Sequence, residues 1–69
     1  MKYAIVIEQG PTSWGAMVPD LPGCVAVANS RAEVERLIQE AIALHLDGMR
    51  QDGLPVAQPV HDVAVVDVK

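Results

Sequence analysis

The fold of this 69-residue chain is decided by residues 30–53, which read SRAEVERLIQEAIALHLDGMRQDG. Apolar side chains recur there every three or four residues, the spacing that places them on one face of an α-helix. Ser30 and Glu33 have the spacing of a capping box, which satisfies free backbone N–H groups in the first turn. Gly53 and the proline that follows it mark the end of the helix. We predict one amphipathic helix from Ser30 to near Asp52, whose apolar face carries Val34, Leu37, Ile38, Ala41, Ile42, His45 and Met49.

Gly48 lies inside this predicted helix, at the border of its apolar face. A glycine in a helix interior is less favourable than alanine by about 1 kcal/mol. Because glycine lets a second backbone come close, we expect such an approach at this position. On the polar face, Arg36 and Glu40 are one turn apart and are expected to form an ion pair.

Three apolar segments before the helix read as β-strands, and they are Tyr3–Ile7, Trp14–Val18 and Cys24–Ala28. The first is apolar on both sides, so we expect both of its faces to be buried. The short link between the first and second segments favours an antiparallel hairpin. Residues 19–23, PDLPG, cannot be regular structure, because proline lacks an N–H donor and glycine permits positive φ.

After the helix, Asp62–Val68 reads as a last strand. The predicted order is therefore β-β-β-α-β, an α+β fold with one helix packed on a mainly antiparallel sheet, in one domain spanning residues 1–69. Both faces of the first and last strands are apolar, yet a single helix covers only one face of a sheet. We expect the other face, or an open edge, to contact another polypeptide, either a second copy or a different protein.

The charge of the chain is −4, with nine acidic and five basic residues. Binding to nucleic-acid phosphates needs clustered Lys and Arg, and the basic residues here are scattered, so we expect no direct nucleic-acid binding. An acidic balance suits a basic protein partner, although it also serves solubility alone.

The single cysteine, Cys24, excludes an internal disulfide and a zinc site made of four cysteines. A lone thiol fits a reducing compartment, and no apolar run reaches the length of a membrane span or resembles a signal peptide. We therefore expect a cytoplasmic protein without a membrane partner. A chain of this size has a small core, which favours a homo-oligomer, as a dimer or larger, as the source of additional buried area.

Residues 14–24, WGAMVPDLPGC, resemble the signature of the HicB-type antitoxin family. The similarity continues through the capped helix, with Glu40-Ala41 and His45-Leu46, to Gly53-Leu54-Pro55 and Pro59, and so covers nearly the whole chain. The family often has a glycine after the third strand, where this chain has Ala28-Asn29.

This resemblance implies a partial RNase H-like fold and a role as an antitoxin. Members of the family neutralise a small basic toxin that cleaves mRNA, by covering its RNA-binding and catalytic surface. Many members carry an additional C-terminal DNA-binding domain, which is not expected here because the last predicted strand directly precedes Lys69. The alternative is an orphan domain that acts as a structural or regulatory oligomer without a toxin.

Seven residues are candidates for an interface or a structural motif. Trp14 is either a core anchor or an interface hot spot. Asp20 is expected to accept hydrogen bonds from nearby backbone N–H groups in its turn, to contact a partner, or both. His45 is either a core histidine bonded to a backbone carbonyl or an interface histidine. The full set is Trp14, Pro19, Asp20, Leu21, Pro22, Gly23 and His45.

We expect no catalytic site, no metal and no cofactor. An RNase H-like nuclease, a remote alternative, needs several converging carboxylates to hold its metal ions. Here Glu8, Asp62 and Asp67 stand at strand ends and are expected to be solvated. Cys24 has no base beside it in sequence, so a small buried apolar side chain is the better interpretation than a nucleophile. His61 has no second ligand at metal-binding spacing.

Overall fold

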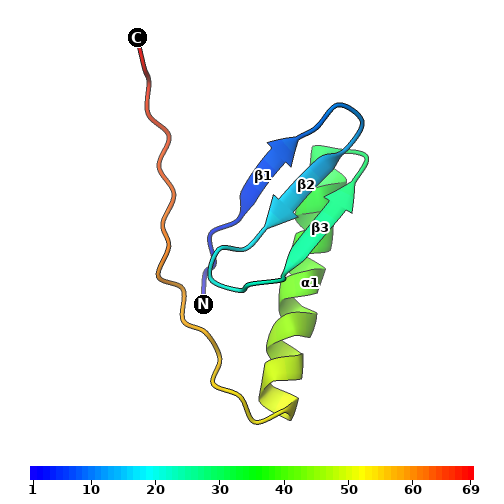
Figure 1. The fold of residues 1–69 in the computed structure, drawn as a ribbon, viewed down its shortest axis with the longest axis vertical. Coiled ribbons are helices and arrows are strands. Elements are labelled where there is room, and N and C mark those ends of the chain that lie inside the picture. The colour runs from blue at the N-terminus through cyan, green and yellow to red at the C-terminus, as the bar shows by residue number, and fades with distance from the viewer.

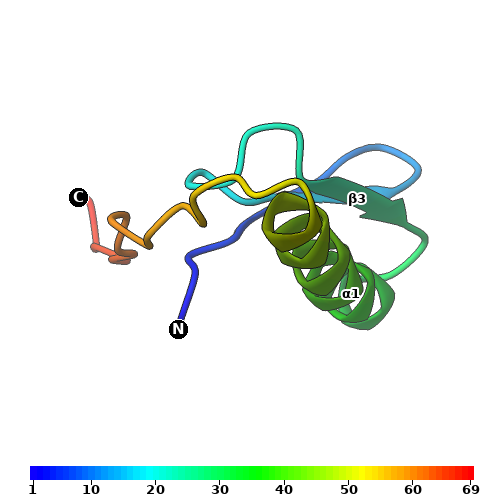
Figure 2. The same ribbon diagram turned by 90° about the horizontal axis from the view of Figure 1, so that it is seen from below.

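The computed structural model describes all residues from Met1 to Lys69. A three-stranded antiparallel sheet of order β1-β2-β3 lies against one long helix, α1 (Figure 1). Seen from below, α1 runs across one face of the sheet and leaves the other face uncovered (Figure 2). The predicted α+β class, with one helix on an antiparallel sheet, is confirmed. The elements are β1 (Val6–Gln9), β2 (Trp14–Met17), β3 (Val25–Ala28) and α1 (Arg31–Gln51).

The strands are joined by two tight connections. Gly10 N donates to Ser13 O at 2.8 Å and closes the hairpin between β1 and β2. Between β2 and β3, Val18 N donates to Cys24 O at 3.2 Å, and Gly23 has φ of 85°. This irregular turn was predicted from its prolines and glycine, and it brings Trp14 of β2 opposite Ala28 of β3.

Both ends of α1 are capped as the sequence predicts. The Ser30 side chain accepts a hydrogen bond from Glu33 N at 3.2 Å. At the other end, Gly53 has φ of 70° and its N–H bonds Arg50 O, while Leu54 N bonds Met49 O. This pair of bonds is a Schellman motif, in which the glycine adopts a left-handed conformation.

Two predictions about the helix surface have different outcomes. The ion pair between Arg36 and Glu40 is confirmed, with a distance of 3.0 Å between Nη1 and Oε1. The expected close approach of a second backbone at Gly48 is wrong, because nothing lies within 4 Å of where a Cβ would stand. The glycine therefore destabilises the helix without a packing benefit in this chain.

The core lies between α1 on one side and β2, β3 and the turn that joins them on the other. Leu46 is buried, although the predicted apolar face named His45 and not Leu46. The reason is that residues four or eight apart, such as Val34, Ile38 and Leu46, lie on one ridge along the helix, and this ridge faces the sheet. The buried apolar residues are Ala16, Val18, Leu21, Cys24, Ala28, Val34, Ile38 and Leu46.

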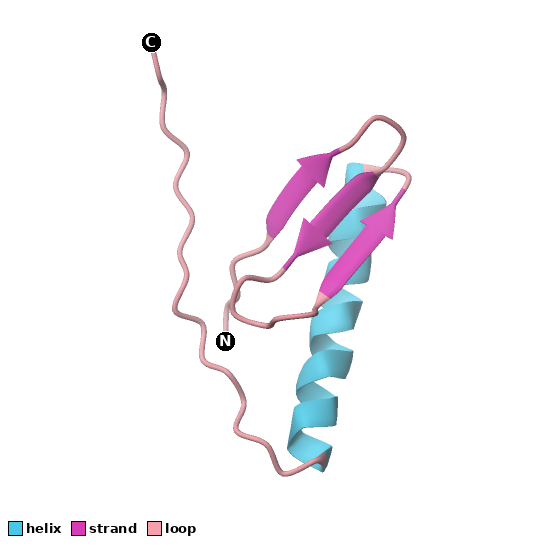
Figure 3. Cartoon of the chain, in the orientation of Figure 1, coloured by secondary structure: helices cyan, strands magenta, loops and turns pink.

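The predicted last strand, Asp62–Val68, is not formed in this chain, so the observed order is β-β-β-α. We call residues 62–68 the C-terminal segment; Figure 3 shows it as an extended loop. No backbone–backbone hydrogen bond involves any residue after Leu54. The prediction is wrong because a strand needs a neighbouring edge to bond, and this segment runs beside the sheet without reaching β1 (Figure 1).

The prediction that the first strand is buried on both faces is also wrong. Val6 is exposed, and Ile7 is only half-buried. The helix covers the face that carries Ile7, and nothing in the chain covers the opposite face. The apolar residues of β1 therefore leave an uncovered surface, as the imbalance between one helix and two apolar faces predicts.

Candidate functional site

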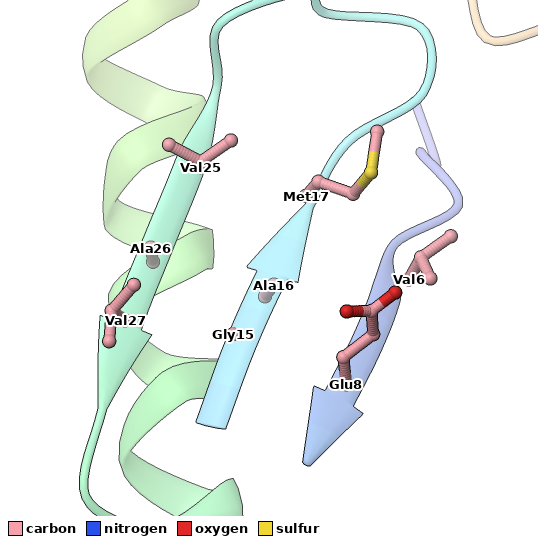
Figure 4. A pocket seen from close by; sticks show the side chains of 8 residues that line it. All are labelled: Val6, Glu8, Gly15, Ala16, Met17, Val25, Ala26 and Val27. Atoms are coloured by element: carbon pink, nitrogen blue, oxygen red, sulfur yellow. The ribbon is translucent and has the colours of Figure 1, made fainter. Parts of the chain in front are cut away.

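The uncovered side of the sheet is a candidate interaction surface, which we call the outer face. Its side chains alternate along each strand with the inner residues, which pack on the side of the core. The register aligns Val6 with Met17, and Met17 with Val25, so apolar side chains form a row across all three strands. The outer face consists of Val6, Glu8, Gly15, Met17, Val25 and Val27 (Figure 4).

A shallow depression lies in the middle of the outer face, over β2. Its floor is Gly15, which has no side chain, and its walls include Met17, Val25 and Val27 (Figure 4). Glu8 is the only charged residue around it. Such a surface suits the apolar part of a protein partner, with a basic group of the partner placed near Glu8.

A second feature holds the start of the C-terminal segment against the body of the protein. The Asp20 side chain is only 3% exposed, and its Oδ1 lies 2.6 Å from His61 Nδ1. Its Oδ2 accepts hydrogen bonds from Val60 N and His61 N, both at 3.2 Å. We call this arrangement the Asp20–His61 clamp. The prediction that Asp20 bonds backbone N–H groups of its own turn is wrong, because its partners are far along the chain.

The charge state of Asp20 follows from these contacts. Burial alone raises the pKa of the Asp20 carboxyl, whereas the hydrogen bonds from His61 and Val60 lower it. The hydrogen bonds outweigh burial, so the pKa lies below its usual value and the carboxylate is ionised at neutral pH. An ionised carboxylate accepts stronger hydrogen bonds than a neutral one, which favours the clamped arrangement.

The connector before the clamp is held at another point. The Tyr3 hydroxyl donates to Ala57 O at 2.5 Å. The chain is thus tied to the residues before β1 and again to the turn between β2 and β3. These contacts fix where the C-terminal segment begins, and the segment itself then extends without a partner.

The candidate residues named from the sequence do not form one site. Trp14 is half-buried at the start of β2 and packs against the core, while the turn with Asp20 lies at the other end of that strand. His45 is half-buried on α1, and its ring makes no hydrogen bond to a backbone carbonyl. The structure therefore does not support the first of its two interpretations, and a role at an interface stays a prediction. Within the turn, Leu21 is buried, Pro19 is half-buried, and Pro22 and Gly23 are exposed.

The other candidate residues for chemistry do not come together in a site. Cys24 is 4% exposed, and burial raises the pKa of its thiol, so the prediction of a small buried apolar side chain is confirmed. Glu8, Asp62 and Asp67 are exposed. No group of three or more His, Cys, Asp or Glu side chains is placed to hold a metal ion. The one helix is not apolar enough along its length to cross a membrane.

The sequence does not identify His61 as the partner of Asp20. His61 follows a proline-flanked connector with no periodic pattern, and no residue near it in sequence indicates which side chain it would contact. Asp20 itself was identified, because a proline-flanked turn restricts it to one place. Its pairing with His61 spans 41 residues, a separation at which local patterns carry no information.

Comparison with known proteins places these features in a family. An uncharacterized 14.9 kDa protein in the rep-hol intergenic region of Haemophilus phage HP1 (strain HP1c1) is 36% identical over 62 residues, which is 87% of this chain. The chain spans 47% of that phage protein, about half its length. A UPF0150 protein of Archaeoglobus fulgidus is 39% identical over 72 residues, covering 100% of this chain and 97% of the relative.

A solved structure, described as the HicA3 and HicB3 toxin-antitoxin complex, contains a chain similar to this one. The TM-score is 0.74 at 28% sequence identity, and the match covers 87% of this chain and 70% of the other. A family model described as "HicB_like antitoxin of bacterial toxin-antitoxin system" matches residues 3–67. The resemblance carried by the turn and the capped helix is confirmed, and this chain belongs to the HicB_like antitoxin family.

Proposed function

We propose that this protein is an antitoxin-like interaction module that binds a small basic mRNA-cleaving toxin and neutralises it. The observation that carries the proposal is the uncovered apolar outer face in a chain of the HicB_like antitoxin family. A similar chain occurs in a structure described as a HicA3 and HicB3 toxin-antitoxin complex, which supports a toxin as the partner class.

The chemistry of the outer face supports a protein partner. Val6, Met17 and Val25 are all exposed, although each is apolar. Removing apolar surface from water is favourable by about 25 cal/mol per Å², so a partner that covers this row gains affinity. The net charge of −4 would speed the encounter with a basic protein, since opposite charges steer association.

A binding experiment tests this proposal. The reading frames next to this gene are first searched for one that encodes a short basic protein, the basic neighbour, which is then the partner to use. The measurements are isothermal titration calorimetry and an mRNA-cleavage assay. We expect binding by the wild-type chain and loss of cleavage in the complex. Val25→Asp should weaken binding by about 1.4 kcal/mol or more, a factor of ten in affinity, because it buries an unpaired charge.

A matched control is available on the helix. Leu44 is 74% exposed and lies on α1, away from the outer face, so Leu44→Asp should leave the affinity unchanged. If the wild-type chain neither binds the basic neighbour nor stops its cleavage of mRNA, the proposal fails. If Leu44→Asp weakens binding and Val25→Asp does not, the toxin is bound through the helix and the outer face is not the site.

A second candidate function is favoured by one observation. The unpaired C-terminal segment exposes apolar side chains that suit association between copies of this chain. A structural or regulatory oligomer without a toxin would use only that surface. Growth of cells that express the basic neighbour separates the two functions: co-expression of this chain restores growth if it is an antitoxin and has no effect otherwise.

A further inference from the structure

We propose that the C-terminal segment is a β-strand that each chain donates to a second copy of itself, where it pairs with the open edge of β1. The exchange is reciprocal, so that two chains form a dimer. This inference does not depend on toxin binding, because it uses the edge of the sheet and not the outer face.

The C-terminal segment has the composition of a strand without the hydrogen bonds of one. Its side chains are mostly valine, a residue that favours strands, and Val65 and Val68 are 95% and 88% exposed. Among its backbone N–H groups, only that of Val63 has a partner, the side chain of Asp62 at 2.8 Å. An extended apolar segment with free donors and acceptors is a template for pairing with another edge.

The open edge of β1 offers those partners. β1 is bonded to β2 on one side and has no neighbour on the other. Beside this edge, Ile5 and Ile7 pack against the core but remain half-buried. A strand added there would cover them with one set of its side chains.

The apolar character of both sides of the C-terminal segment also follows from this position. Side chains alternate along a strand, so Val63 and Val65 face one way, and Val66 and Val68 face the other. In a strand at the edge of β1, one set would cover the inner residues of β1. The other set would extend the apolar row that begins at Val6. Each set is mainly apolar, with Asp62 in one and Asp67 in the other, as this position requires of a strand that covers inner residues on one side and continues the apolar row on the other.

The Asp20–His61 clamp directs the segment away from its own sheet. The bonds from Val60 and His61 to Asp20, with the bond from Tyr3 to Ala57, hold the chain up to the first residue of the segment. From there the segment diverges from β1 of the same chain (Figures 1 and 2). Pairing with its own β1 would need the segment to turn back from this anchored start.

A second copy is the occupant that these features specify. Each chain has one free strand and one open edge, and both lie on the β1 side of the sheet (Figure 1). A two-fold axis on that side would place each segment on the β1 edge of the other chain, and both requirements would be met by one symmetric contact. β3 is the far edge, which the segment does not approach.

A paramagnetic NMR experiment on the full chain tests whether the pairing is between chains. One chain carries the substitutions Cys24→Ala and Val65→Cys, with a nitroxide spin label on the new cysteine and no ¹⁵N. It is mixed with wild-type chain that is enriched in ¹⁵N and carries no spin label. We expect line broadening at the amides of Val6–Gln9 in the wild-type chain, which can arise only from the label on the other copy. In a second sample, the same chain carries both the spin label and ¹⁵N. Broadening in this sample without broadening in the mixed sample would show pairing within one chain and would overturn the proposal.

The dimer itself is measured by light scattering after size-exclusion chromatography. Val65→Asp should weaken dimerisation by roughly tenfold or more, because a charge would be buried without a partner. This variant should fold, since the Val65 residue is 95% exposed in the single chain, and circular dichroism checks that it does. Leu44→Asp is the control and should dimerise as the wild type does. A monomeric wild type, or a dimer that Val65→Asp leaves intact, contradicts strand exchange without bearing on toxin binding, which is read from Val25→Asp.

Discussion

Asp20 joins two parts of the chain that are 41 residues apart, because its carboxylate accepts hydrogen bonds from the Val60 and His61 amides and contacts the His61 ring. The sequence predicts the turn that holds Asp20, since prolines and a glycine restrict the backbone there. It does not predict the partner, because hydrogen bonds between distant segments depend on the path of the whole chain. The same reasoning applies to His45 and Leu46, which are adjacent in sequence. Leu46 is buried because it lies on the ridge of α1 that faces the sheet, whereas His45 lies beside that ridge and is half-buried.

Replacing the Asp20 carboxylate should release the start of the C-terminal segment. Asp20→Asn keeps the shape of the side chain but removes its charge, so the hydrogen bonds from Val60 and His61 weaken. We expect hydrogen exchange at these amides to accelerate by roughly tenfold or more, measured by mass spectrometry. Asp62→Asn is the matched control, since Asp62 bonds only the adjacent Val63 and should not change that exchange. Equal exchange in Asp20→Asn and wild type would show that the clamp does not hold the segment.

The clamp should also depend on pH in a defined direction. The pKa of Asp20 is lower in the folded protein than its ordinary value of 3.8, so the unfolded chain binds more protons in acid. The stability that the charged carboxylate contributes is therefore complete above about pH 4 and is lost as the pH falls through the lower, folded value. Denaturant unfolding of wild type and Asp20→Asn between neutral and acidic pH measures this. The difference in unfolding free energy should be constant from neutral pH to about pH 5 and should shrink below about pH 4. A difference that grows in acid would contradict the assignment.

Among the elements, α1 and the three strands follow from local patterns. The helix follows from apolar spacing and from its caps at Ser30 and Gly53, both of which are confirmed. The strands follow from short β-branched runs separated by turn residues. The C-terminal segment has the same kind of pattern and yet forms no strand in this chain, because pairing needs a partner edge that a sequence pattern does not identify.

The interior of α1 offers a test of helix stability. Gly48→Ala should raise the free energy of unfolding by about 1 kcal/mol, because alanine favours the helix and the added Cβ meets nothing within 4 Å. For a domain of this size, the melting temperature should rise by about 4–8 °C. Gly53→Ala is the control with the opposite sign, since φ of 70° costs an alanine about 1–2 kcal/mol. A destabilising Gly48→Ala would mean that another backbone contacts the helix there, for example from a second copy.

At the scale of the whole molecule, the exposed apolar surfaces and the net charge matter more for partner binding than the small core does. The chain extends over 46 × 27 × 16 Å, and its long dimension runs from the C-terminal end of α1 to the end of the C-terminal segment (Figure 1). The sequence predicts the imbalance behind this shape, because one helix cannot cover apolar residues on both faces of a sheet. It does not predict which surface meets which partner. The register places the outer face over β2, and the clamp places the C-terminal segment beside β1.

The most direct test of the central claim, that the outer face binds a protein partner, is a titration followed by methyl NMR. The full chain with labelled valine and leucine methyl groups is titrated with the basic neighbour used in the binding experiment. The account predicts that the methyl signals of Val25 and Val27 shift on binding, whereas those of Leu44 on α1 do not. Shifts at Leu44 with unchanged signals from Val25 and Val27 would contradict it.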